Sequence, residues 1–283
     1  MLSRRVAAGF SLLEVVVAMS VTLLVSGAIY QLLVTTQRLT RAQSEHLMLQ
    51  SSVRNAVLVV LNELRELNTA AGLGPERNDI LSGTPTAVSY RASRGFGVLC
   101  QPAGATQIRL ARSTFIGARD PQPGRDSAYV FLEGDGTRAD DDFWQAIAIA
   151  GVSTSGACAG TAEPGITLTV PTTAPLVGLA AGTPVRIGEI MELRLYQSES
   201  KWWLGMRSVT SGEVIQPLAG PLASDGLRLQ YLDRNGASTM DLSAVRSISI
   251  AIRGISAGVT HANDAALSQE LVSNVVLRNS GSE

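Results

Sequence analysis

Residues 10–34 are mostly apolar, and Glu14 is the only formally charged residue among them. A helix of about 20 predominantly apolar residues spans the hydrocarbon core of a bilayer, which is roughly 30 Å thick. The pattern therefore predicts a transmembrane helix over residues 10–34.

The apolar pattern changes after residue 34, although no proline interrupts the chain before Pro75. Apolar residues from Leu39 to Leu67 recur largely at steps of three and four, which is typical of an amphipathic helix. We therefore expect one helix over about residues 11–68, with residues 35–70 as its amphipathic half. At 1.5 Å per residue it would be roughly 85 Å long. Gly72, Gly74 and Pro75 are expected to end it.

After Pro75, short apolar runs are separated by Gly, Pro, Ser, Thr and Asp, which indicates strands joined by turns. The expected strands are residues 87–91, 107–112, 128–133, 144–152, 165–170, 184–197, 202–209, 214–218, 227–232, 245–253 and 271–277. Turns are expected at residues 198–200 and at Asn235-Gly236, a pair favoured in tight hairpins. The sequence thus predicts an α+β fold, with a long N-terminal helix packed on a β-rich antiparallel head at residues 71–283.

The charged residues of the N-terminal segment suggest how it sits in the membrane. A carboxylate at the bilayer centre costs about 2.5 to 3.5 kcal/mol on insertion scales, so Glu14 is expected to need a cationic partner. Arg4 and Arg5 precede the apolar run and place that end of the chain in the cytoplasm by the positive-inside rule. No Ala-x-Ala pattern follows residue 34 closely, so the apolar helix is expected to stay on the protein.

The run Gly9-Phe10-Ser11-Leu12-Leu13-Glu14 resembles the class III leader of type IV pilins and pseudopilins. The resemblance implies that a prepilin peptidase removes residues 1–9 by cutting between Gly9 and Phe10, and that the new N-terminus is methylated. It also implies that Glu14 pairs with the N-terminal ammonium of a neighbouring subunit. The protein would be held in the bacterial inner membrane by one span, with a periplasmic head, before it joins other minor and major pilins in a pilus fibre or pseudopilus.

The later part of the chain is similar to PilW-type minor pilins at residues 192–196, 202–207, 227–236, 245–250 and 275–279. That similarity implies a role in priming or assembling type IV pili or in their tip complex. The J-type pseudopilin of type II secretion has a similar Tyr-x-Asp-x-x-Gly run and is the main alternative. A minor pilin whose head binds DNA or surfaces is a further alternative. However, the net charge is −1 and Lys201 is the single lysine, so nucleic-acid binding is not expected.

Two cysteines, Cys100 and Cys158, fall in the part of the chain that would be exported. Because that compartment is oxidising, a disulfide is favoured over a metal site. The alternative of two free catalytic thiols lacks a Cys-x-x-Cys spacing or a neighbouring histidine.

The most acidic stretch offers carboxylates that could hold Ca²⁺ through hard oxygen ligands. Its members are Glu133, Asp135, Asp140, Asp141 and Asp142. Their spacing does not fit the EF-hand loop, so we expect a solvated loop and no cofactor, with calcium as the alternative.

Gly254-Ile255-Ser256-Ala257-Gly258 matches the Gly-x-Ser-x-Gly pattern of hydrolases. That motif needs a strand-to-helix turn and an acid followed by a histidine, whereas His261 here precedes Asp264 and no histidine follows. We therefore expect a flexible loop and no enzyme activity.

The pair Trp202-Trp203 would place one indole on each face of a strand. We expect core packing for these rings, with a contact surface as the alternative.

Overall fold

The computed structural model describes residues 11–69, 78–134, 137, 142–171, 176, 178–259 and 266–278. The chain divides into two compact units, Met1–Met48 with Ser256–Leu267 and Leu49–Ile255 with Ser268–Glu283. The predicted leader residues Arg4, Arg5 and Gly9, together with Phe10, lie outside the described residues.

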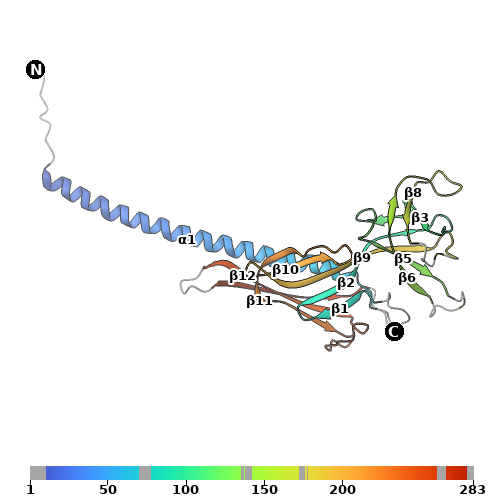
Figure 1. Ribbon diagram of the computed structural model, residues 1–283. Helices are drawn as coiled ribbons and strands as arrows, with labels where there is room; N and C mark the ends of the chain where they lie inside the picture. The colour runs from blue at the N-terminus through green and yellow to red at the C-terminus, as the bar shows by residue number, and fades with distance from the viewer. Residues whose placement is uncertain are drawn as a thin grey trace, which may run out of the picture. The chain divides into compact units, whose positions relative to one another are not determined.

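One helix, α1 (Leu12–Arg65), runs from the first unit into the second (Figure 1). It begins after Ser11, whose hydroxyl oxygen accepts a hydrogen bond from the Glu14 backbone N–H at 3.2 Å. A serine in this position satisfies one of the backbone donors that a helix leaves open at its start.

The helix ends at Arg65, earlier than the expected Asn68. Asn68 is instead tied to the residues before the first strand. Its N–H donates to the Asp79 carboxylate at 2.8 Å, and its carbonyl oxygen accepts from the Asp79 N–H at 2.7 Å. These bonds give Asn68 partners outside the helical ladder, so the helix stops before it.

The strands have the following bounds: β1 (Ile80–Thr84), β2 (Ala87–Val98), β3 (Gln107–Ala111), β4 (Ile116–Gly117), β5 (Ser127–Leu132), β6 (Phe143–Ala148), β7 (Gly151–Ser153), β8 (Gly165–Thr169), β9 (Pro184–Ser198), β10 (Lys201–Ser208), β11 (Gln216–Leu232), β12 (Ser247–Val259) and β13 (Ala266–Val276). A short 3-10 helix, η2 (Arg112–Thr114), follows β3.

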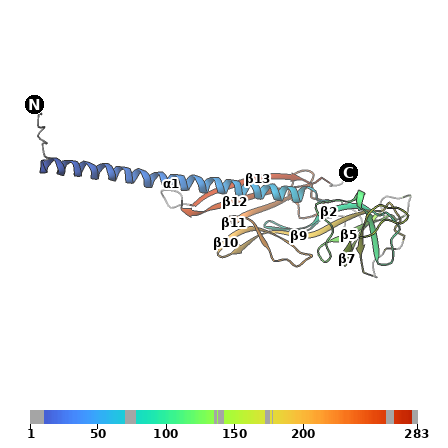
Figure 2. The same cartoon turned by 90° about the horizontal axis from the view of Figure 1, so that it is seen from above.

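A large sheet has the strand order β1-β2-β9-β10-β11-β12-β13 (Figure 2). β4 joins it by pairing with β2, β5 pairs with β9, and β6 pairs with β5. The pairs β1–β2, β2–β9, β9–β10, β10–β11 and β11–β12 are antiparallel. A separate small sheet has the order β3-β8-β7 and is also antiparallel. The predicted α+β fold, a long apolar helix with an antiparallel β head, is confirmed.

β9 changes partner along its length. On one side it pairs with β2 at residues 184–194, whereas on the other it pairs with β5 at residues 185–188 and with β10 at residues 191–198. Glu189 and Ile190 lie at the change of partner. There the Ile190 N–H donates to the Thr210 hydroxyl at 3.0 Å, and its carbonyl accepts from the Val209 N–H at 2.8 Å.

In the second unit, the helix buries one apolar stripe. Its members are Leu49, Val53, Ala56, Val57, Val60 and Leu64, which recur at three- and four-residue steps. Gly254 on β12 lies under the start of this stripe, because a Cβ placed there would come within 2.6 Å of Leu49 Cδ1 and 2.8 Å of Val53 Cγ2. The missing side chain therefore lets the helix approach the strand closely.

A second set of buried residues joins the small sheet to the neighbouring strands of the large one. Ile108, Leu110, Ile166 and Leu168 come from β3 and β8, and they share an apolar cluster with Val185 and other residues. The head thus has a core under the small sheet in addition to the helix-packed surface.

Several predicted strand limits were wrong. β1 and β4 were missed, and the expected strand 144–152 is two strands, β6 and β7. The split has a tertiary cause, since β6 pairs with β5 in the large sheet and β7 pairs with β8 in the small one. The expected strands 214–218 and 227–232 are instead parts of one strand, β11, whose pairing with β12 is irregular between Leu222 and Leu227.

Candidate assembly helix and the ionic cluster of the head

Glu14 lies in the first turn of α1 and its side chain is exposed. A carboxylate at this place interacts favourably with the positive end of the helix dipole. The neighbouring apolar residues are exposed on every side of the helix: Leu12, Leu13, Val16, Val17, Leu24 and Leu32 all have more than half of their area accessible. This segment therefore has no core of its own within the described chain.

The apolar surface is large enough to outweigh the single charge in a membrane. Residues 12–34 contain 13 leucine, isoleucine and valine residues. At about −0.3 to −0.6 kcal/mol for each one near the bilayer centre, they supply roughly −4 to −8 kcal/mol. The carboxylate of Glu14 costs about 2.5 to 3.5 kcal/mol at the same depth. The segment is thus long and apolar enough to cross a bilayer, in agreement with a mean hydropathy of 2.2 in its most apolar window.

The second unit contains a buried ionic cluster around Glu189, whose side chain is 1% exposed. Arg94 Nε lies 2.9 Å from its carboxylate and Arg119 Nη2 lies 3.3 Å away. Arg125 Nε lies 2.6 Å from the other carboxylate oxygen, in an orientation that makes this contact an ion pair without a hydrogen bond. One carboxylate therefore collects three guanidinium groups from β2 and from the loop before β5.

The positive charges around Glu189 explain why its carboxyl group is ionised although it is buried. Burial alone would raise the pKa of the Glu189 carboxyl, but a hydrogen bond from Ser208 and the guanidinium groups of Arg94 and Arg125 together hold that pKa below its usual value. Arg119 also forms a bidentate pair with the buried Asp126. Glu189 is thus held ionised at the point where β9 changes partner.

The helix enters this network through Glu63. Its carboxylate accepts a hydrogen bond from the Tyr90 hydroxyl at 3.1 Å and lies 3.4 Å from Arg94 Nη1. Burial and the adjacent Glu63 carboxylate raise the pKa of Tyr90 well above its usual value, so this hydroxyl stays protonated and donates. The cluster therefore fastens residues 49–65 of α1 to β2 and β9 by polar contacts as well as by the apolar stripe.

The disulfide between Cys100 and Cys158 is present, with a Cα–Cα distance of 5.7 Å. It joins the residues after β2 to the loop before β8, and Cys158 is buried. The Ala159 N–H donates to the Gln101 side chain at 2.9 Å, so the two loops also meet next to the bridge.

The acidic loop is only partly described. Among its calcium candidates, Glu133 and Asp142 are described, whereas Asp135, Asp140 and Asp141 lie outside the described residues. Asp142 accepts a hydrogen bond from the Gly134 N–H at 3.1 Å, which closes the base of the loop. Over the residues that the structure covers, no three His, Cys, Asp or Glu side chains gather as a metal site.

The Gly-x-Ser-x-Gly run does not form the predicted loop. Gly254, Ile255 and Ser256 lie within β12, and the Ser256 hydroxyl accepts a hydrogen bond from the Leu267 N–H at 3.0 Å. The strand-to-helix turn that the hydrolase motif requires is replaced by a continuous strand, and Gly254 serves helix packing. His261 lies outside the described residues.

The paired indoles are both half-buried on β10. Trp203 packs on Gly220, where an added Cβ would come within 2.6 Å of the ring. His46, one of the two histidines of the chain, is exposed on α1.

Sequence reasoning missed the cluster around Glu189. Its arginines are distributed over residues 94–125, and its other carboxylates come from α1, from Asp126 before β5 and from the residues after β10. No spacing in one sequence brings these residues together, because the contacts depend on how β9 pairs with its neighbours.

The chain matches the prokaryotic N-terminal methylation motif over residues 4–30. The matched segment contains Arg4, Arg5, Gly9, Phe10 and Glu14. No curated protein and no solved structure matches the chain. The motif supports a type IV pilin-like protein and implies processing by prepilin peptidase and assembly with other pilins.

Proposed function

We propose that this chain is a minor type IV pilin of the PilW type, which is cut by prepilin peptidase and takes part in priming filament assembly or in the tip complex. The observation that carries the proposal is the helix segment at residues 12–34, which exposes apolar side chains on every side and carries one carboxylate, Glu14, in its first turn. Such a segment needs lipid before assembly and the helices of other subunits afterwards.

Glu14 aligns the subunits in this proposal. A cut between Gly9 and Phe10 leaves an ammonium group at Phe10, four residues before Glu14. The ammonium group of an incoming subunit can pair with the Glu14 carboxylate of a neighbour, which offsets the cost of holding each charge among apolar helices. Other positions along the segment lack such a charge, so the pairing fixes the axial register.

The PilW assignment rests on the later half of the chain. Its similar segments, residues 192–196, 202–207, 227–236, 245–250 and 275–279, fall on or next to β9, β10, β11, β12 and β13. These five strands are consecutive neighbours in the large sheet, which supports one shared structural element (Figure 2).

The Tyr-x-Asp-x-x-Gly run, shared with J-type pseudopilins, has a local role. The Asp233 carboxylate accepts from the N–H groups of Asn235 and Ala237 at 2.8 and 2.9 Å, and Gly236 has a φ of +75°. These contacts form the turn after β11. Because the turn itself accounts for Asp233 and Gly236, these two residues give no reason to prefer the pseudopilin.

Deletion of the gene in its native host tests the assignment. We expect loss of surface pili, counted by electron microscopy, with undiminished export of type II secretion substrates, and restoration of pili by the intact gene. Normal piliation with lost secretion would overturn the pilus assignment in favour of the pseudopilin.

Two point variants test the assembly role in the same strain. Gly9→Val should leave the leader uncut, so the variant protein should run on gels at the mass of the unprocessed chain. Glu14→Ala should be cut normally and fail to enter pili. Ser20→Ala is the matched control, because the Ser20 hydroxyl is exposed and donates to the Val16 carbonyl at 2.9 Å within the same segment. Normal incorporation of the Glu14→Ala chain would refute the pairing.

We also propose that the head is neither an enzyme nor a nucleic-acid binder. The strand position of Ser256 supports the first statement, and the net charge of −1 with a single lysine supports the second. A hydrolytic activity abolished by Ser256→Ala, or a salt-sensitive shift of duplex DNA by the purified chain, would contradict this proposal.

A further inference from the structure

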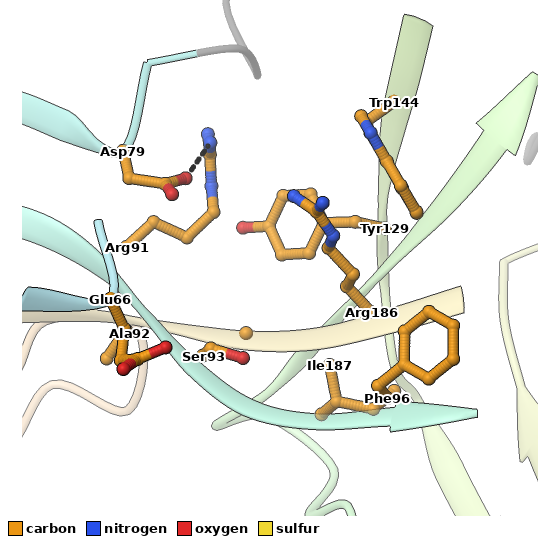
Figure 3. A pocket seen from close by; sticks show the side chains of 11 residues that line it. Glu66, Asp79, Arg91, Ala92, Ser93, Phe96, Tyr129, Trp144, Arg186 and Ile187 are labelled. Atoms are coloured by element: carbon orange, nitrogen blue, oxygen red, sulfur yellow. Dashed lines mark hydrogen bonds and ion pairs between the residues drawn. The ribbon is translucent and has the colours of Figure 1, made fainter. Parts of the chain in front are cut away.

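A pocket of about 170 Å³ opens in the second unit between β2, β5, β6 and β9 (Figure 3). Arg91 and Arg186 both line it, together with the aromatic rings of Phe96, Tyr129 and Trp144. Figure 3 shows the Arg91 guanidinium beside the Asp79 carboxylate, whereas the Arg186 guanidinium is drawn over the Tyr129 ring in this view. The pocket thus combines two cations with aromatic walls.

The two arginines differ in how their charges are balanced. Arg91 Nη1 lies 3.1 Å from the Asp79 carboxylate, and its guanidinium lies 4.6 Å from the centre of the Tyr129 ring. Asp79 is itself held by the Asn68 N–H. Arg91 therefore has a buried structural role that joins the end of α1 to β2.

Arg186 has no carboxylate within ion-pair distance among the residues that the structure describes. Its guanidinium stacks over Trp144, 4.2 Å from the ring centre. Arg186 is exposed at the opening of the pocket, where partial loss of water and the neighbouring charge of Arg91 lower the pKa of its guanidinium and the Asp79 carboxylate partly opposes them. Glu66, at the rim of the pocket, already pairs with Arg278 at 3.0 Å. The pocket therefore holds one cation more than its described carboxylates balance.

We propose that this pocket binds one carboxylate-bearing side chain, a glutamate or aspartate, of a partner polypeptide. Arg186 would pair with the carboxylate, and Trp144 and Phe96 would contact the apolar stem of the side chain. This inference concerns the head alone and goes beyond the assembly role proposed for Glu14.

The size and charge of the pocket favour this ligand. Sites for drug-sized molecules are about 300 to 1,000 Å³, so a space of 170 Å³ suits a single side chain. A planar guanidinium matches a carboxylate in a bidentate pair. A phosphate, with about −1.5 to −2 charges, would meet the Asp79 carboxylate in the same pocket and exceed the one unbalanced cation.

The residues at the mouth of the pocket also favour a polypeptide as the ligand. Phe96 is 41% exposed, so an apolar ring is open to solvent at the mouth of the pocket. Ser93, three residues before Phe96 on β2, also lines the pocket, is exposed and can hydrogen-bond to the main chain of a bound peptide. An anchor residue in a pocket with polar contacts at its rim is a common arrangement at protein interfaces.

The test uses the full mature chain in detergent micelles, labelled with 5-fluorotryptophan, and ¹⁹F NMR. The chain has three tryptophans, and a Trp144→Phe variant identifies the Trp144 resonance. The probe is the capped tripeptide acetyl-Ala-Glu-Ala-amide, with acetyl-Ala-Gln-Ala-amide as its uncharged match. We expect the glutamate peptide to shift the Trp144 resonance in a saturable manner and the glutamine peptide to bind at least tenfold more weakly.

Two variants assign the effect to Arg186. Arg186→Gln should weaken binding of the glutamate peptide at least tenfold, and Arg186→Lys should bind with intermediate affinity, because it keeps the charge without the planar fork. Lys201→Gln is the matched control, since it removes one exposed positive charge outside the pocket and should leave binding unchanged.

Several results would overturn the proposal. These are a Trp144 resonance that does not move with the glutamate peptide, equal binding of both peptides, or unchanged binding in Arg186→Gln. Tighter binding of inorganic phosphate or glucuronate than of the glutamate peptide would assign the pocket to a phosphate or acidic saccharide instead. All these readouts come from the head, so they are independent of whether the chain enters pili.

Discussion

Replacement of Glu189 by glutamine is expected to destabilise the head strongly, because it removes the charge that three arginines share. Removing one partner of a buried ion pair costs about 3 to 5 kcal/mol. Here each arginine keeps a second carboxylate: Arg94 keeps Glu63, Arg119 keeps Asp126, and Arg125 keeps Glu213. We therefore expect a loss at or just below the lower end of that range, about 2 to 3 kcal/mol in the free energy of unfolding.

The loss should depend on pH in a defined direction. The folded-state pKa of Glu189 lies below the ordinary value of 4.5. A carboxyl with a depressed pKa stabilises the fold above its unfolded pKa, and this stabilisation is lost as the pH falls through the folded pKa. The stability difference between the native chain and Glu189→Gln should therefore be complete at about pH 7 and narrow below about pH 4.5.

Urea unfolding of the mature chain in detergent, followed by tryptophan fluorescence, measures this difference. Glu270→Gln is the matched control, because Glu270 pairs with Arg228 on the surface, where an ion pair contributes about 0 to 1 kcal/mol. If Glu189→Gln is no less stable than Glu270→Gln at neutral pH, or if the difference grows on acidification, the role assigned to the cluster is wrong.

Three other changes to the head can be followed in the same unfolding assay. Gly254→Val should cost about 1 to 3 kcal/mol by pushing α1 off β12, and an unchanged urea midpoint would refute the close packing. The double change Glu199→Asn and Ser200→Gly should add about 1 kcal/mol, because φ values of 49° and 62° fit an Asn-Gly turn; a loss would contradict that turn type. Changing Cys100 and Cys158 to serine should cost about 2 to 4 kcal/mol, as expected for a bridge across 58 residues, and a reductant should then have no further effect.

The helix and most strands could be predicted because their signals are local. A three- and four-residue step marks residues 49–64, and alternation marks Ile248, Ile250 and Ile252 on β12. β1 carries only one buried residue, Ile80, and β4 is two residues long, so neither has a pattern to detect. The split between β6 and β7 depends on which sheet each strand joins, and one sequence does not contain that information.

The candidate sites divide in the same way. Glu14 could be identified because it is a single charge inside an apolar run, and the run itself sets its chemistry. The partners of Glu189 and the unbalanced charge of Arg186 depend on tertiary contacts. In the sequence, Glu189 and Arg186 are two charged residues in a predicted strand. The burial of Glu189 and the contacts of Arg186 follow from the strands that pair with β9 on both sides.

The division of α1 between two environments makes folding and assembly separable. Residues 49–65 are fixed by the apolar stripe and by Glu63, whereas Glu14 touches no core of the described chain. A change at Glu14 should therefore leave the urea midpoint of the head unchanged while it blocks entry into pili. A change at Glu189 should lower the amount of folded head first, and reduce pili only in proportion to that amount. Measuring both quantities for both variants thus distinguishes a subunit that cannot assemble from one that cannot fold.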